Sequence, residues 1–486
     1  MSSLSLRRCL LRVLPILALS SVLSSPAAAT LLVKNAQLIT VDPVQPVTMS
    51  GWFLVGDDGR IAALAAGQPG DEVSADEVLD AAGRIVAPGF ISAHSHLYMS
   101  PVRGVGFDST LYGWGRALGP ILRRTTGDDI YWFTLHGSLD FLRNGITTAY
   151  DFTNSGVNYT PAVGLNEKVP YGVPREGPFE ENQIRAKADA GLRFVNSVGL
   201  PRVGAPAETR ARYENVLTFF NAFARDEPLA LKMAISGGVQ RAPDIGAAHL
   251  EAALMHDHGL INQSHFLESP ERVAEQQAKF AWYEEAGALG PQMIFGHFIQ
   301  VTDAIVAKVA ATDSRMCWQP TSNGRLASGI PDVTAYRAAG IKVGIGLDDQ
   351  SCTDISDPFQ NMRIGMYTMR ALHSDAAAMP VGDMLFLHTL GSAQILDIDA
   401  DVGSLEVGKF ADFLVVDPRA PDTGPIHNLL ATYVLACGLR NLDLVYVGGR
   451  RVAAGTTMLS YDESIVRHEV DTRMARIKAD IAVSER

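Results

Sequence analysis

The chain has 486 residues, and its 53 acidic and 41 basic side chains leave a net charge of −12. The length is enough for one large barrel with a small appended domain. The acidic balance argues against nucleic acid or an anionic membrane as a partner. The four cysteines are too few and too scattered for a disulfide framework, so stability must come from the core.

Residues 1–29 have the three-part layout of a secretory signal peptide. Arg7 and Arg8 precede an apolar stretch over 13–23, and small residues follow up to Ala29. The apolar stretch is too short for a permanent membrane span. We expect cleavage after Ala29 and a periplasmic or secreted protein that does not stay in the membrane.

Both ends of the remaining chain read as short strands. Residues 30–85 contain short strand patterns with a hairpin turn at Asp57-Asp58-Gly59, and residues 403–460 contain similar short strand patterns. Two such segments can pair into one small β-sandwich. Residues 461–486 read as a charged amphipathic helix on the surface.

Between these ends, apolar strand patterns alternate with helical patterns, which is typical of parallel βα units in an α/β fold. The expected strands cover residues 90–96, 146–152, 194–198, 229–236, 260–266, 293–299, 315–320 and 343–348.

Histidine or aspartate ends four of these segments. His94 and His96 are one residue apart and therefore point to the same side of a strand. His265, His297 and Asp348 end three later segments. As separate buried polar groups, each would need its own hydrogen-bond partner, whereas one shared metal satisfies them together. The pattern therefore predicts a metal site.

Several motifs in order resemble the amidohydrolase superfamily, most of all its branch of triazine chlorohydrolases and S-adenosylhomocysteine and guanine deaminases. The resemblance runs from about Leu31 to Val452 and includes His265-x-x-Glu268, Pro320-Thr321-Ser322-Asn323, Gly346-Leu347-Asp348 and the stretch 403–412. It implies a (β/α)8 TIM barrel over 86–402, with a small β-sandwich domain built from 30–85 and 403–460.

The resemblance also implies roles for the strand-end residues. His94, His96, His265 and Asp348 would bind one divalent metal, zinc by preference, with iron or manganese as substitutes. Asp348 would also take a proton from the attacking water, Glu268 would shuttle a proton to the leaving group, and His297 would polarise the electrophile. These roles describe an exported hydrolase of a C–N bond in a small amide, urea or aminated heterocycle.

Other interpretations of the same residues stay open. Glu268 can be a surface acid at a helix start, and His297 a fourth metal ligand or a core histidine. Lys232 also resembles the carboxylated lysine of two-metal prolidase-like dipeptidases, although a strand lysine can simply reach solvent or pair with an acid. A non-catalytic metal- or solute-binding protein is a further alternative, but it would not need Glu268 and His297.

Four further side chains are candidates for substrate binding. Arg103, Trp114 and Trp318 lie near expected strand ends, and Asn323 follows Pro-Thr-Ser, where it either caps a helix or orients Asp348. The segment 153–184 is long and rich in Gly and Pro, and we expect it to form a lid over the metal. The expected partner is a small-molecule substrate. The sequence leaves open whether the chain forms a homo-oligomer.

Overall fold

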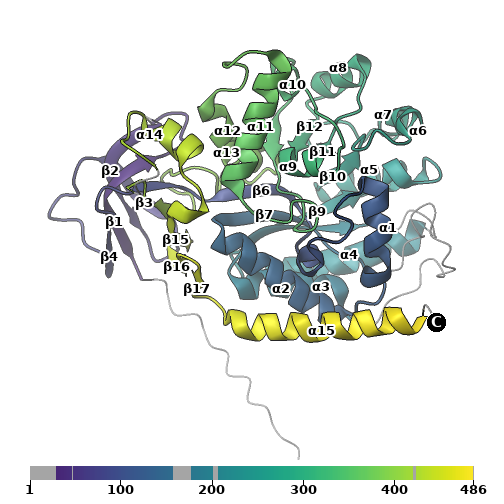
Figure 1. The fold of residues 1–486 in the computed structure, drawn as a ribbon, viewed down its shortest axis with the longest axis horizontal. Coiled ribbons are helices and arrows are strands. Elements are labelled where there is room, and N and C mark those ends of the chain that lie inside the picture. The colour runs from purple at the N-terminus through teal and green to yellow at the C-terminus, as the bar shows by residue number, and fades with distance from the viewer. Residues whose placement is uncertain (1–28, 46, 157–176, 201–205, 420–422, 485–486) are drawn as a thin grey trace, which may run out of the picture.

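The computed structural model describes residues 29–45, 47–156, 177–200, 206–419 and 423–484 (Figure 1). Residues 1–28 of the predicted signal peptide and residues 157–176 of the predicted lid lie outside these ranges. Within them, no helix combines the length and the apolar character that a membrane span requires.

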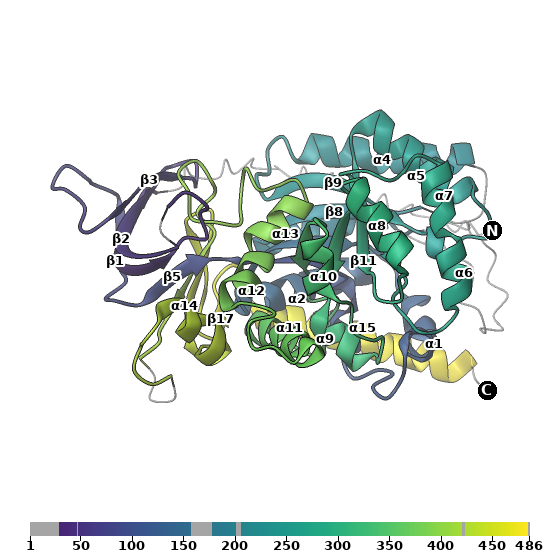
Figure 2. The ribbon, with the colours of Figure 1, turned by 90° about the horizontal axis from the view of Figure 1, so that it is seen from above.

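Eight parallel strands form the barrel, and each pairs with its neighbours in chain order (Figures 1 and 2). Each of the eight predicted segments contains a strand, although the sixth, seventh and eighth strands end two or three residues earlier than expected. They are β6 (Phe90–Ser95), β7 (Ile146–Phe152), β8 (Arg193–Gly199), β9 (Ala230–Gly237), β10 (Ile261–Phe266), β11 (Met293–His297), β12 (Arg315–Trp318) and β13 (Val343–Ile345).

The barrel closes where β13 meets β6, through side-chain and loop hydrogen bonds. The Asp348 amide donates to the His94 carbonyl at 2.9 Å, and the Leu347 amide donates to Ser92 Oγ at 3.0 Å. Gly346 allows this approach, because a Cβ there would lie 2.4 Å from the Cβ of His94. The closure therefore holds two predicted metal ligands, His94 and Asp348, side by side.

Helices surround the barrel (Figure 2). Their bounds are α1 (Leu111–Leu122), α2 (Gly127–Arg143), α3 (Phe179–Ala190), α4 (Pro206–Phe223), α5 (Gly246–His258), α6 (Val273–Ala278), α7 (Phe280–Glu285), α8 (Asp303–Ala311), α9 (Pro320–Arg325), α10 (Val333–Ala338), α11 (Pro358–His373), α12 (Val381–Leu387) and α13 (Leu390–Ile395). Short helical turns are η1 (Leu97–Val102), η2 (Val239–Arg241), α14 (Leu429–Ala431), η3 (Thr432–Ala436) and η4 (Leu439–Asn441). An apolar cluster that includes Ile91, Tyr150, Val195, Ile261 and Ile294 fills the barrel interior.

Both chain ends build one further sheet, as predicted. Its strands are β1 (Leu31–Ile39), β2 (Thr48–Val55), β3 (Ile61–Ala66), β4 (Glu77–Asp80), β5 (Ile85–Pro88), β14 (Phe413–Val416), β15 (Leu442–Val447), β16 (Arg450–Ala454) and β17 (Thr457–Met458). They form one connected nine-stranded sheet in the order β17-β16-β15-β14-β5-β1-β2-β3, with β4 on β1. Side chains from both chain ends, such as Phe53 and Phe413, share its core.

The boundary between this sheet and the barrel differs slightly from the prediction. The expected barrel start at residue 86 falls inside β5, which pairs with β1 and β14. The chain passes into the barrel at Gly89, where a Cβ would lie 2.0 Å from Thr147 Oγ1. Glycine is therefore required at the crossing.

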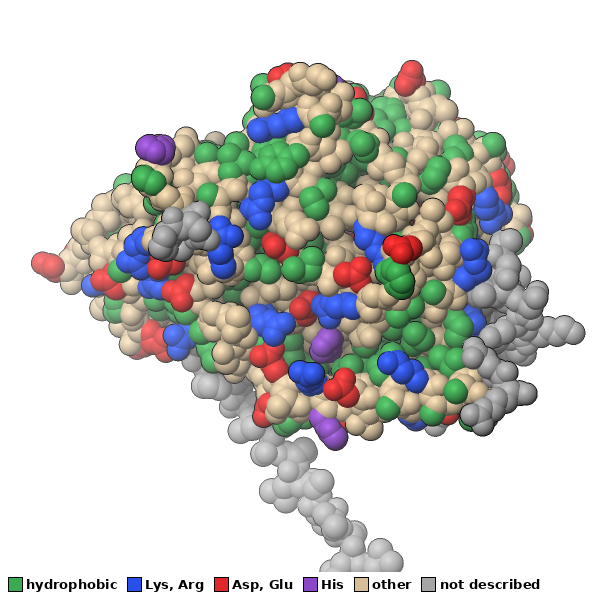
Figure 3. Space-filling model, in the orientation of Figure 1, with side chains coloured by type: hydrophobic (Ala, Val, Ile, Leu, Met, Phe, Trp, Pro, Cys, Tyr) green, Lys and Arg blue, Asp and Glu red, His purple; other side chains and the backbone are tan. Residues whose placement is uncertain are grey.

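The last helix, α15 (Glu463–Ser484), runs along the outside of the barrel (Figure 1). Val466, Val470, Met474 and Ile477 are its buried side chains, and the helix lies against α2. On the described part of the face shown in Figure 3, acidic and basic side chains are interspersed, without a continuous basic patch.

Candidate active site

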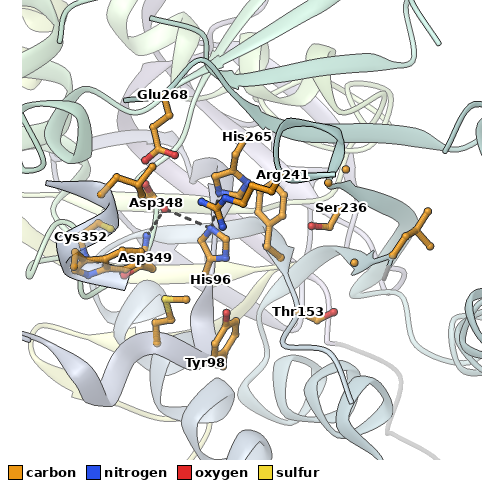
Figure 4. A pocket seen from close by; sticks show the side chains of 18 residues that line it. His96, Tyr98, Thr153, Ser236, Arg241, His265, Glu268, Asp348, Asp349 and Cys352 are labelled. Carbon is orange, nitrogen blue, oxygen red and sulfur yellow. Dashed lines mark hydrogen bonds and ion pairs between the residues drawn. The ribbon is translucent and has the colours of Figure 1, made fainter. Parts of the chain in front are cut away.

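A pocket with a cavity volume of about 220 Å³ opens at the C-terminal ends of the barrel strands (Figure 4). This is the end at which such barrels carry their active sites. Side chains that line it include His96, Tyr98, Trp114, Arg241, His265, Glu268, Asp348, Asp349 and Cys352.

Three imidazoles converge beside one carboxylate here: His96, His265 and Asp348 line the pocket, and His94 lies next to His265 and Asp348. The Nε2 atoms of His94 and His96 each lie 3.1 Å from Nε2 of His265. Asp348 Oδ1 lies 3.7 Å from Nε2 of His94 and 3.6 Å from Nε2 of His96. Around a tetrahedral zinc with Zn–N bonds of about 2.0–2.1 Å, ligand nitrogens stand about 3.3 Å apart, so this donor set fits a single ion.

The three imidazoles are neutral, as ligands must be. Burial lowers the pKa of His94 and of His265 well below the usual histidine value, and neighbouring imidazoles lower both further. Burial also lowers the pKa of His96 to about 3, against the opposing effect of Asp348. Each ring therefore keeps a lone pair for a metal at neutral pH.

Two side chains that the sequence did not single out hold these candidate ligands in place. His94 Nδ1 donates to Gln263 Oε1 at 2.5 Å, and Gln263 Nε2 donates to the Ala93 carbonyl at 2.9 Å. This leaves Nε2 of His94 as the nitrogen that could bind a metal. Ser322 Oγ donates to Asp348 Oδ2 at 2.7 Å, which leaves Oδ1 facing the imidazoles.

Asn323 orients His297. The sequence had predicted that Asn323 either caps a helix or orients Asp348. His297 Nδ1 donates to Asn323 Oδ1 at 2.8 Å. His297 Nε2 then points into the site, 3.7 Å from Glu268 Oε1 and 3.8 Å from Asp348 Oδ2. This edge of the ring can pass a proton to or from either carboxylate.

Glu268 lies inside the pocket wall and is only 2% exposed, so it is not a surface acid. Burial raises the pKa of its carboxyl, and the charge of His297 opposes this effect. Glu268 Oε2, His297 Nε2 and Asp349 Oδ2 have no hydrogen-bond partner among the described residues. Buried polar atoms without partners are costly, so these three indicate a site that is completed by a ligand.

Of the four predicted substrate contacts, the pocket wall contains Trp114 but not Arg103, Trp318 or Asn323. Trp114 lines the wall, and its buried Nε1 has no partner among the described residues. Trp318 is 1% exposed and faces α11, where a Cβ at Gly365 would lie 2.9 Å from its ring. Arg103 forms an ion pair with Asp140 at 2.5 Å and lines a different cavity.

The two-metal interpretation of Lys232 is wrong in this structure. Lys232 lies near the start of β9, whereas Gly237 at its end is level with Ser264 of β10, the residue before His265. Lys232 Nζ faces Asp397 at 3.5 Å and is not part of the pocket. The structure therefore gives no support to a second ion held by Lys232 beside the imidazoles.

The chain matches the model of the amidohydrolase family over residues 85–452. It is 28% identical over 458 residues to the 5-methylthioadenosine/S-adenosylhomocysteine deaminase of Desulforudis audaxviator (strain MP104C), covering 92% of this chain and 99% of that protein.

Two zinc-containing crystal structures have the same fold. An adenosine deaminase from Xanthomonas campestris superimposes with a TM-score of 0.79 at 22% identity, over 92% of this chain and 98% of that one. The atrazine chlorohydrolase of Arthrobacter aurescens TC1 superimposes with a TM-score of 0.78 at 18% identity, over 91% of this chain and 100% of that one. The predicted family resemblance is confirmed. The alternative that the chain is a non-catalytic metal- or solute-binding protein has no support from these relatives. The chain belongs to the amidohydrolase family and is a metal-dependent hydrolase that acts on carbon–nitrogen bonds.

Proposed function

We propose that this enzyme is an exported deaminase that removes ammonia from a small aminated heterocycle with the help of one zinc ion. The observation that carries the proposal is the convergence of three neutral imidazoles on Asp348, with Glu268 and His297 at the same cluster. The deaminases among the related proteins support the choice of an aminated ring over a simple amide or urea.

The ligand set would be His94, His96, His265 and Asp348. When bound there, a divalent ion lowers the pKa of the attacking water from about 15.7 towards about 7. Asp348 accepts the proton of that water through an oxygen that Ser322 keeps in position. Zinc is favoured because nitrogen ligands with one carboxylate suit a borderline cation, and iron or manganese are the substitutes to test.

Proton transfer to the leaving nitrogen falls to Glu268. Its carboxyl is buried, has one oxygen without a partner among the described residues, and lies within 3.7 Å of His297 Nε2. A carboxyl in this environment can hold a proton and release it to a basic nitrogen. His297, fixed by Asn323, presents the edge that can polarise the ring at the carbon under attack.

The direct test is ammonia release by the zinc-loaded protein from a panel of aminopurines, aminopyrimidines and aminotriazines, with amides and ureas as comparison. Turnover of at least one aminated ring, lost in Glu268→Gln and kept in Glu285→Gln, supports the proposal. Glu285 is a matched control because it is an exposed glutamate at the end of α7. Turnover of amides or ureas alone would contradict the deaminase assignment.

Export rests on the signal layout of residues 1–29, and we propose it on that basis. The protein isolated from its native cell should begin near Thr30 and lie outside the cytoplasm. N-terminal sequencing that found Met1 on cytoplasmic protein would contradict this.

A further inference from the structure

The pocket carries one cationic side chain that the mechanism does not use. Arg241 ends the short turn η2 after β9 and lines the wall beside His96 and His265 (Figure 4). Among the described residues that line the pocket, it is the sole lysine or arginine, whereas Glu268, Asp348 and Asp349 supply three acids.

Arg241 has no protein partner in the described part of the chain. No hydrogen bond or ion pair joins its guanidinium to any described residue, and its side chain belongs to an exposed residue. It lines the same pocket wall as His96 and His265. A guanidinium that faces a pocket without a protein partner is available to bind an anion.

The backbone that carries Arg241 is held from both sides. The buried Lys279 Nζ donates to the carbonyls of Gln240 at 3.1 Å and Ala242 at 2.8 Å. Gln240 Oε1 in turn accepts from the Leu267 amide at 2.8 Å, next to Glu268. The Arg241 backbone is thus fixed relative to the proton-transfer group, which is the preorganisation that a binding contact requires.

We propose that Arg241 binds a carboxylate of the substrate, so that the enzyme selects molecules that carry this group as well as the bond to be hydrolysed. The proposal rests on the proposed function for the identity of the reaction. Guanidinium matches a carboxylate with two parallel hydrogen bonds, which gives both affinity and orientation. A monoanion suits the pocket better than a phosphate dianion, because three acidic side chains face the same space.

The test is a binding measurement that needs no turnover. Zinc-loaded wild type, Arg241→Gln and Arg467→Gln are titrated with benzoate and with its neutral isostere nitrobenzene. Arg467 is the matched control because it is an arginine of α15 whose side chain is 84% exposed. Metal content is measured for each protein, since zinc can contribute equally to benzoate binding in all three.

Wild type and Arg467→Gln should bind benzoate, and Arg241→Gln should lose about 10- to 100-fold of that affinity at equal zinc content. Nitrobenzene should bind all three alike. Equal benzoate affinity in Arg241→Gln, equal loss of both probes, or no benzoate binding to wild type would each overturn the proposal.

Failure of this proposal can be told apart from failure of the proposed function. If no aminated heterocycle of the substrate panel released ammonia, the proposed deaminase activity would be refuted, but the benzoate-binding result would be unaffected. For any substrate that is found, Arg241→Gln should raise KM for the carboxylate-bearing member of a matched pair far more than it changes kcat. Its neutral partner should show no such change.

Discussion

A single amide side chain decides which nitrogen of His94 faces His265. Gln263 accepts from Nδ1, and its own Nε2 is tied to the Ala93 carbonyl. The proton on Nδ1 therefore stays there, and the lone pair of Nε2 is directed at His265. Hydrogen-bond partners of this kind set both the tautomer and the orientation of a ligating ring.

We predict that Gln263→Leu lowers zinc affinity by about 10- to 100-fold while the protein stays folded. Leucine fills a similar volume but cannot accept the Nδ1 proton, so the two tautomers of His94 compete. Competition with a chromogenic chelator measures the affinity, and circular dichroism checks the fold. Zinc affinity equal to wild type would show that the ring is held by packing alone.

Glu268→Gln tests the proton-transfer role. We expect zinc content and thermal stability to be kept, and the rate of hydrolysis to fall by about 10²–10⁴-fold, because the amide cannot carry a proton. Asp348→Asn should in addition lose zinc, since a neutral amide is a weaker ligand. Turnover of Glu268→Gln within a few-fold of wild type at equal zinc content would remove Glu268 from the mechanism.

Elements far apart in the chain meet at the closure of the barrel. Gly346 lies against β6 so closely that a Cβ would be 2.4 Å from the Cβ and 2.8 Å from the backbone N and O of His94. We predict that Gly346→Ala lowers both thermal stability and zinc affinity, because relief of the contact has to move His94. Gly115→Ala is the control, since a Cβ there meets nothing within 4 Å. Loss of stability with unchanged zinc affinity would separate the closure from the metal site.

His388, which follows α12, couples this helix to the barrel in a pH-dependent way. Its Nδ1 donates to the Ile91 carbonyl at 3.0 Å, and Asn361 Nδ2 donates to its Nε2 at 3.3 Å. Burial lowers the pKa of His388 to about 4, so the folded protein binds the proton less readily than the unfolded chain. The stability that a neutral His388 provides is complete above pH 6.5 and is lost as the pH falls towards 4.

When the pH falls from 7 to 5, protonation of His388 in the unfolded chain should lower the free energy of unfolding by about 2 kcal/mol. In His388→Asn, where nothing titrates at this position, that part of the pH dependence should disappear. Urea denaturation of both metal-free proteins at the two pH values measures it. An identical pH dependence in the two proteins would contradict the assignment.

For the whole molecule, we expect one zinc ion per chain. Elemental analysis of wild type and of Lys232→Ala should give the same value, because Lys232 faces Asp397 and not the imidazoles. Removal of the ion should lower Tm, and its return should restore Tm, since a ligand that binds the folded state alone stabilises it. A second ion that depends on Lys232 would contradict the structure.

Strand ends were the part of the molecule that the sequence could predict. His94, His265 and Asp348 follow apolar segments, and the ends of parallel strands must meet on one face. Which way a side chain points was harder to infer. Trp318 ends β12 as expected, but it faces α11, while Gln263 and Ser322 act through contacts with residues distant in sequence. Such contacts leave no local pattern.

One feature of the small sheet bears on the order in which the protein is made. β5 lies between β1 and β14, so that Val86 pairs with Val415 across the chain. The ribosome completes β5 and must then add the whole barrel before β14 exists, which takes tens of seconds at about 5–20 residues per second. During that time the outer edge of β5 has no strand beside it, and an open edge invites pairing with other chains. Chains that terminate before β14 should therefore aggregate even when their barrel sequence is intact.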